Sequence, residues 1–414
     1  MQKLEKQLFS VSLSIILIAT AQNILASTPI STTGTLCIGI ECKKQASTAE
    51  EFMPIFAKQI KTYNEKAPQF WPTNHVINQT AIVVNMPRTK AWLVTPQGNY
   101  KSIPVAEADQ YYVTTGYDTE FKAFKDINGQ SGMVLTLNED SLANPASFKK
   151  YAHLGTYDLF ITYTHELFHQ LEQPTWKESV ANTNPDREEN SDKVAERATR
   201  GLILQQLLNA FIYPEQQRDY VKKAVATYRY YQKQYPEEAH KAITYDNLEG
   251  SAYYFELMSC LYISYPDIKN IEDILEAYRL IAKDVDVTKN LGLVLEAYAL
   301  GGLSGLLLDY YQDPVIWKQA IMQKTEATPL NQLAELFDKE ITEKDIIKPD
   351  EAWLKKYEDI ARAGAPVLSQ DQINTMIPLL KDLKKDSPTD YEAMLEEIKK
   401  SNPTSYDLII KQLQ

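Results

Sequence analysis

The sequence predicts an α+β protein, with a small N-terminal β-sheet lobe followed by a larger, mainly α-helical lobe. Two patterns predict this class. β-prone runs occur before residue 138, at residues 81–84, 91–94, 111–114 and 133–137. From about residue 151 onward, apolar residues recur at helical spacing and no further strand pattern stands out. A chain of 414 residues is long enough to bury the core of two lobes.

The N-terminal lobe is expected to open with an amphipathic helix over residues 48–65. Its apolar residues fall on one face, and Pro68 and Pro72 follow it and are expected to end it. A turn at residues 86–88 separates the first two strand patterns, and glycines at 129 and 132 lead into the last one. These patterns predict a small sheet immediately before the helical lobe.

The helical lobe is predicted to contain helices over residues 194–211, 219–235, 246–264, 271–283 and 291–311, with Pro236 ending the second. Residues 330–414 have the pattern of charged amphipathic helix with proline breaks. The run 291–308 is apolar enough to suggest a membrane span. Glu296, Asp309 and four glycines indicate instead a helix packed tightly in the core.

The N-terminus has the pattern of a secretory signal peptide. Lys3 and Lys6 precede an apolar run over residues 8–19, and the cleavage site is expected after Ala21 or Ala26. The apolar run is short for the alternative, a permanent membrane anchor. We therefore expect an exported protein, either periplasmic or secreted.

Cysteine content and charge limit the alternatives further. An exported protein can join Cys37 and Cys42 in a disulfide, which leaves Cys260 unpaired and buried in a helix. The net charge of −12 argues against nucleic acid or an anionic membrane surface as a partner. Neither property identifies a substrate.

The pattern H-E-x-x-H occurs at residues 165–169, in an apolar context. On a helix, His165 and His169 lie four residues apart and project from one face, so that both imidazoles can bind one zinc ion. Glu166 can then act as the general base toward a water that the zinc activates. The alternative is a helix with two histidines on its polar face and no metal.

A third protein ligand is required to complete such a site. No histidine follows His169 by six residues, so the ligand is expected to be a carboxylate from a later helix. Spacing favours Glu196 over Glu249, although Gly250 leaves room for close helix packing beside Glu249. Each candidate has a structural alternative. Glu249 and Asp246 have the spacing of a helix capping box, and Glu196 can form an ion pair along its own helix.

The H-E-L-F-H pattern at residues 165–169 and the L-E-G-S-A-Y-Y pattern at residues 248–254 together resemble the gluzincins, the peptidase MA clan. Aminopeptidases of that clan carry an N-E-G-x-A-x-Y-like helix whose glutamate binds zinc. The resemblance implies one Zn²⁺ ion held by His165, His169 and Glu249, with Glu166 as the general base. It also suggests Tyr298 as the donor to the developing oxyanion, and it leaves Glu196 as a partner that orients a ligand histidine.

The chain is also similar to a group of uncharacterised exported bacterial proteins of this type. They share a Trp-Pro pair before the first strand, here Trp71 and Pro72, and a late Y-x-x-G…L-L-L-D helix, here residues 298–309. The similarity covers roughly residues 68–320. The gap before the glutamate is longer than in the aminopeptidases, which implies an inserted helical hairpin. No G-x-M-E-N-like motif precedes residue 165, so endo- and exo-cleavage both stay open.

These observations predict an exported zinc metallopeptidase that hydrolyses peptide bonds. The alternative is a catalytically silent zinc-site protein, acting as a binding module or as a secreted effector with one dedicated partner. The expected organisation is a signal peptide (1–26), a flexible leader (27–47), a β-rich lobe (48–150), a helical zinc-binding catalytic lobe (151–320) and a C-terminal helical region (321–414).

Overall fold

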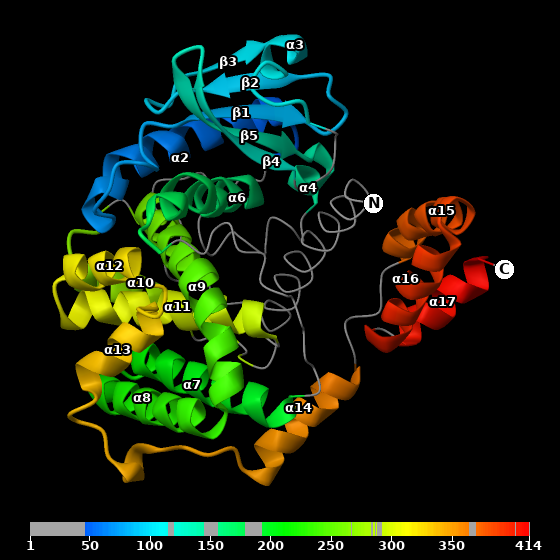
Figure 1. Cartoon of the computed structure of the whole chain (residues 1–414). Coiled ribbons are helices and arrows are strands. Elements are labelled where there is room, and N and C mark those ends of the chain that lie inside the picture. Colours follow the sequence, from blue (N-terminus) through cyan, green and yellow to red (C-terminus); the bar gives the residue numbers. More distant parts are fainter. Residues whose placement is uncertain are drawn as a thin grey trace. The chain divides into compact units, whose positions relative to one another are not determined.

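The computed structural model describes residues 46–114, 120–144, 156–178, 193–265, 267–282, 285, 287, 292–363, 370–401 and 403–413. The predicted signal peptide, nearly all of the leader and the Cys37–Cys42 pair lie outside these residues. The predicted α+β class is confirmed, because a small N-terminal sheet precedes a large helical part (Figure 1).

The described chain forms two compact units. The first contains the residues up to 178 together with Thr199–Lys348, and the second contains residues 193–198 and the chain from Pro349 onward. The boundary therefore falls inside helix α7 (Val194–Ile212), between Ala198 and Thr199. All the candidate site residues except Glu196 belong to the first unit.

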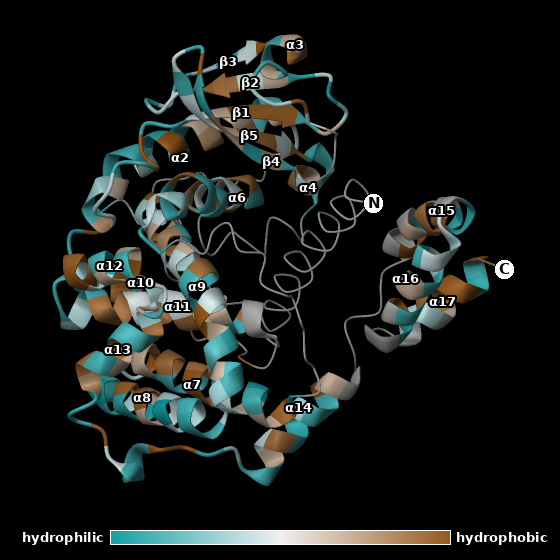
Figure 2. Cartoon of the chain, in the orientation of Figure 1, coloured by the Kyte–Doolittle hydropathy of each residue, from teal (hydrophilic) through white to brown (hydrophobic). Residues whose placement is uncertain are grey.

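The sheet has five strands in the order β3-β2-β1-β5-β4. Strand β1 (Thr80–Asn85) pairs in parallel with β5 (Gln130–Leu137). The other pairings are antiparallel: β2 (Ala91–Val94) pairs with both β1 and β3 (Tyr100–Ile103). Strand β4 (Phe121–Ile127) pairs with β5. Every residue of β1 is buried, which is expected of a central strand covered on both faces. Strands β1 and β2 accordingly take the hydrophobic colour in Figure 2.

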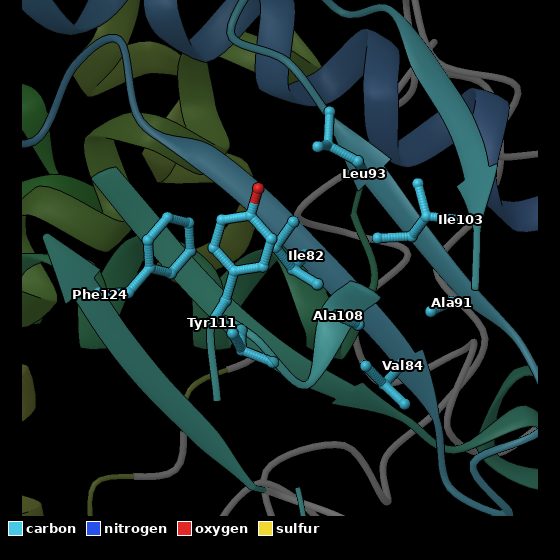
Figure 3. Close-up of a cluster of buried hydrophobic side chains, with 9 residues drawn as sticks. Ile82, Val84, Ala91, Leu93, Ile103, Ala108, Tyr111 and Phe124 are labelled. Carbon is cyan, nitrogen blue, oxygen red and sulfur yellow. The ribbon is translucent and has the colours of Figure 1, made fainter. Parts of the chain in front are cut away.

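One face of the sheet carries a cluster of buried apolar side chains, which Figure 3 shows. Alternate residues of β1, such as Ile82 and Val84, contribute to it, as expected from the period of two along a strand. Tyr111 closes the cluster, with its ring centroid 4.8 Å from that of Phe124. It follows the short helix α3 (Val105–Ala108).

The strand predicted over residues 111–114 is wrong. Tyr111 and Tyr112 pack their rings against the cluster instead of pairing with a neighbouring strand, so their apolar character reflects coverage of the sheet. Strands β3 and β4 escaped prediction because they lie at the two edges of the sheet. Two of the four residues of β3 and three of the seven residues of β4 are polar, and few residues of either strand are buried.

The helix at the start of the described chain, α2 (Ala49–Phe70), is longer than predicted. Thr48 caps it by accepting a hydrogen bond from the backbone N–H of Glu51. Pro68 lies in the last turn, where it removes only its own N–H, and the helix ends when the N–H of Trp71 bonds to the carbonyl of Ala67. The predicted stop was therefore early.

The first unit is otherwise helical. Figure 1 shows α6 between the sheet and α9, and the contacts of α6 with β5 and α9 agree with that placement. Its helices are α4 (Glu139–Ala143), α6 (Asp158–Leu167), α7, α8 (Gln217–Gln234), α9 (Pro236–Ser264), α10 (Ile271–Ala282), α11 (Leu293–Tyr311), α12 (Pro314–Gln323) and α13 (Pro329–Phe337). The second unit contains α14 (Glu351–Ala363), α15 (Gln370–Asp386), α16 (Pro388–Ser401) and α17 (Pro403–Leu413). Cys260 is buried on α9.

Helix α11 is a core helix, since Leu300, Leu303, Leu306 and Leu307 are all almost fully buried. Within the part of the chain that the structure describes, no helix has the length and apolar character that crossing a membrane requires.

Helices α9 and α11 cross at two glycines. A Cβ atom added to Gly301 would lie 2.1 Å from the Cα atom of Gly250, and one added to Gly250 would lie 2.9 Å from the Cα atom of Gly301. Gly250 was expected to leave room for close helix packing beside Glu249, and the helix that packs there is α11.

We expect Gly301→Ala to lower the free energy of unfolding by about 3 kcal/mol, because the added methyl group meets backbone that cannot move aside like a side chain. In Gly250→Ala the nearest atom to the added methyl group is farther away, so the loss of unfolding free energy should be smaller. Urea denaturation of the two variants beside the wild type measures both effects, and equal stability of all three proteins would contradict the close crossing.

Candidate metal centre

The H-E-x-x-H residues lie where α6 passes into a π-helical turn, η1 (Phe168–Glu172). His165 and Glu166 are in the last turn of α6, and His169 is on η1. The two imidazole rings have centroids 4.6 Å apart, and their Nε2 atoms are 2.9 Å apart. Both rings thus project to one side of the helix, and π-helical turns of this kind are frequent at functional sites.

Glu249, in the middle of α9, brings its carboxylate to the same point. Its Oε2 atom is 3.2 Å from Nε2 of His169 and 3.4 Å from Nε2 of His165. In the described chain, these three residues are the group whose ligand atoms lie close enough to share a metal ion. Glu196, in the first turn of α7, is not part of that group.

The capping-box explanation of Glu249 is wrong. Helix α9 begins at Pro236, ten residues before Asp246, so Asp246 and Glu249 lie inside the helix and not at its N-terminus. Pro236 was expected to end the preceding helix only. It also occupies the first position of α9, where a proline costs no hydrogen bond.

The spacing of the three ligand atoms fits a zinc ion. Four ligands at tetrahedral zinc, with bond lengths near 2.0–2.1 Å, lie about 3.3 Å from one another. The three observed separations are 2.9, 3.2 and 3.4 Å. Two imidazole nitrogens and one carboxylate oxygen also form the donor set typical of a catalytic zinc site, with a fourth position left for water or substrate.

The electrostatics show that a positive charge is favourable at this point. Burial would lower the pKa of His165, but hydrogen bonds to Glu249 and Glu256 outweigh it and raise this pKa to about 10. Burial would raise the pKa of Glu249, and the two histidines instead hold it well below its usual range. A proton on His165 therefore offsets negative charge in the cluster, and a bound cation would take the place of that proton.

Glu166 is in a different electrostatic position from Glu249. It is buried, and the loss of water raises its pKa, against the opposing attraction of His169 and His165. The two glutamates thus differ in how readily they hold a proton. Such a separation of pKa values is common between a metal ligand and a general base.

Further side chains surround the three ligands. Nδ1 of His165 is 3.0 Å from Oε2 of the buried Glu256, which lies on α9 two turns after Glu249. Tyr298, on α11, stacks its ring on that of His165, with the centroids 5.2 Å apart and an angle of 13° between the planes. Burial and the adjacent carboxylates raise the pKa of Tyr298, which keeps its hydroxyl protonated and able to donate.

His169 has a partner of its own within the same helical stretch. Its Nδ1 atom is 2.7 Å from Oε1 of Gln173, which opens the short helix η2 (Gln173–Thr175). Sequence reasoning missed both Gln173 and Glu256. A signal for each was present, because Gln173 follows His169 by four residues and Glu256 follows Glu249 by seven, and both spacings return to the same helix face.

Glu172 is fully buried and fixes the end of η1, the π-helical turn that carries His169. Its Oε2 atom accepts from Oγ1 of Thr73 at 2.5 Å and lies 3.0 Å from Nδ1 of His75, while its Oε1 atom accepts from Nε1 of Trp176 at 3.1 Å. Glu172 thus ties η1 to the loop between α2 and β1, which limits movement of His169.

The edge strand β4 approaches the same stretch of helix. The backbone N–H of Ala123 donates to Oε1 of Gln170 at 2.7 Å. Among the described residues β4 pairs with β5 alone, so its other edge faces the η1 side of the sheet. An unpaired strand edge therefore lies beside the residue that follows His169.

A buried ion cluster holds α7, α9 and α11 together near the site. The guanidinium of Arg200 bonds to Asp246 through two contacts of 2.6 and 3.1 Å and to Glu296 through one of 2.7 Å, and all three side chains are almost fully buried. Asp246 lies one turn before Glu249, and Glu296 lies two residues before Tyr298. The cluster therefore fixes the two helices that supply these residues.

We expect Arg200→Met to lower the free energy of unfolding by about 3–5 kcal/mol, because it leaves two buried carboxylates without their cation. The matched control is Arg218→Met, which breaks the exposed ion pair with Glu340 and should cost about 0–1 kcal/mol. Thermal or urea unfolding compares the two variants. A similar small loss in both would contradict the stabilising role of the Arg200 cluster.

No family model, no curated protein and no solved structure matches this chain. The interpretation of the site therefore depends on its own geometry and chemistry.

Proposed function

We propose that the protein is an exported zinc-dependent metallopeptidase of the gluzincin type. The observation that carries the proposal is the convergence of one ligand atom each from His165, His169 and Glu249 at tetrahedral spacing, with Glu166 buried beside them. The sequence pattern of a signal peptide, in residues outside the described part of the chain, supports export.

Zinc held by these three side chains would polarise the scissile carbonyl and lower the pKa of the attacking water to about 7. The carboxylate of Glu166 accepts a proton from that water and passes it to the leaving amine. Its raised pKa suits this exchange, because a base must also release the proton it has taken. The buried setting of Glu166 also limits the loss of that proton to solvent.

Two further side chains have defined tasks in this proposal. Glu256 accepts the hydrogen on Nδ1 of His165, which leaves the Nε2 atom free to bind the metal. The ring of Tyr298 stacks on His165, and its protonated hydroxyl can donate to the oxyanion that forms on the scissile carbonyl.

An extended peptide is the substrate class that fits. Within the described ranges, strand β4 has an unpaired edge next to η1, and an extended segment can add to such an edge through main-chain hydrogen bonds. The donor on Ala123 is occupied by Gln170, so a peptide that uses it must displace one side-chain amide. Binding through the main chain places few demands on substrate sequence.

The test is hydrolysis of a broad peptide library by the mature, zinc-loaded protein, with a chelator-treated sample as control. The proposal predicts cleavage products that disappear with the chelator and return when zinc is added. Zinc binding without cleavage of any peptide would favour the alternative, a silent zinc-site protein that recognises a dedicated partner. Cleavage that persists in the metal-free sample would contradict the mechanism.

A further inference from the structure

Gln173 connects two of the three proposed ligands. It is only 1% exposed, and its amide makes three contacts. Oε1 lies 2.7 Å from Nδ1 of His169, while Nε2 donates to the carbonyl of Leu248 at 2.6 Å and to Oγ of Ser251 at 3.0 Å. Leu248 and Ser251 flank Glu249 on α9, so one amide touches both His169 and the turn that carries Glu249.

The contacts fix which way the amide faces. The carbonyl of Leu248 can only accept a hydrogen bond, so Nε2 of Gln173 must point toward it. Oε1 then faces His169, and since a carbonyl oxygen can only accept, Nδ1 of His169 must carry a hydrogen. The neutral ring therefore keeps its lone pair on Nε2, the atom that faces His165 and Glu249.

Ser251 completes the arrangement. Its hydroxyl donates to the carbonyl of Asn247 at 2.6 Å, which leaves the oxygen free to accept from Gln173. The backbone carbonyls of residues 247 and 248 and the hydroxyl of Ser251 thus form one hydrogen-bonded unit with the amide. Side-chain networks of this kind hold a single geometry when every member is satisfied.

We propose that Gln173 is a positioning residue for zinc binding, which sets the tautomer and ring orientation of His169 and the position of Glu249 together. The inference rests on the proposed function, because it presumes that zinc binds at this site. His165 depends on a separate partner, Glu256. The site therefore has two independent supports, one for His165 and one for the pair of His169 and Glu249.

An amide suits this position better than a carboxylate. Glu166, Glu249 and Glu256 already place three carboxyl groups around the two imidazoles, and a glutamate at residue 173 would add a fourth. It would also face the carbonyl of Leu248 with an acceptor in place of a donor. Gln173 orients His169 without either cost.

The test is the zinc affinity of Gln173→Met in the full-length mature protein, measured by competition with a chelator. We expect a loss of about 10–100-fold, the range for partners that orient a metal ligand. The matched control is Gln217→Met, which removes a buried glutamine at the first residue of α8 that accepts from the hydroxyl of Tyr311. Zinc affinity should be unchanged in the control, and an equal loss in both variants would overturn the proposal.

A double-mutant cycle separates positioning from general destabilisation. Ser251→Ala should lower zinc affinity less than Gln173→Met, and the double variant should bind zinc no more weakly than Gln173→Met alone, because Ser251 acts through the amide. Fully additive losses would contradict the shared network.

The visible spectrum of the cobalt-substituted protein supplies a second readout, since it reports the geometry of the ligands directly. It should change in Gln173→Met and not in Gln217→Met. A wild type that binds neither zinc nor cobalt would overturn the proposed function itself. A wild type and a Gln173→Met variant with equal affinity and equal spectra would overturn the role of Gln173 alone.

Discussion

Glu166→Gln is expected to lower kcat/KM for peptide hydrolysis by about 10²–10⁴-fold, the usual contribution of a general acid–base group. Glutamine has almost the same shape as glutamate but cannot accept the proton of the attacking water. Zinc binding should persist, because Glu166 is not among the three residues whose ligand atoms converge. The measurement is steady-state hydrolysis of a peptide that the wild type cleaves, with zinc content determined on the same sample.

The zinc determination is the control for this variant, because it separates a loss of the chemical step from a loss of the metal. A loss of activity with a full complement of zinc assigns Glu166 to the chemical step. Activity close to that of the wild type would remove Glu166 from the mechanism, whatever the zinc content.

Glu249→Ala is expected to weaken zinc binding by more than the 10–100-fold typical of an orienting partner, since it removes a ligand itself. The carboxylate oxygen lies within 3.4 Å of both imidazole nitrogens, and alanine leaves nothing in its place. The two histidines then hold the ion alone. Competition with a chelator of known affinity measures the change.

Two controls accompany that variant. Glu238→Ala removes another buried carboxylate of α9, eleven residues and about 16 Å before Glu249 on the helix, and should leave zinc affinity unchanged. Glu196→Ala tests the rival ligand that spacing favoured. A loss of zinc from Glu196→Ala, with retention by Glu249→Ala, would exchange the two assignments.

The part of the site that sequence could predict is the part made by one helix. His165, Glu166 and His169 lie within five consecutive residues, so helical periodicity alone places both imidazoles on one side. Glu249 lies eighty residues beyond His169, and spacing pointed toward the nearer glutamate. Only the packing of α9 against α6 brings its carboxylate to the histidines, and a pattern along the chain does not contain that packing.

The fold was also predictable only in part: the sequence indicated the buried strands, but not the edge strands or every helix boundary. The buried strands β1, β2 and β5 have apolar runs that stand out, whereas the edge strands β3 and β4 carry the polar residues that solvent permits. Pro236 illustrates the limit at a boundary. A proline that ends one helix can also begin the next, and the sequence signal for the two events is the same.

The measurement that tests the central claim most directly is the zinc content of the purified mature protein. The arrangement of His165, His169 and Glu249 predicts about one zinc ion per chain, removed by a chelator and restored by added zinc. A wild-type protein that is folded, takes up no zinc and gains no stability when zinc is added would contradict the metal centre, and with it the proposed peptidase.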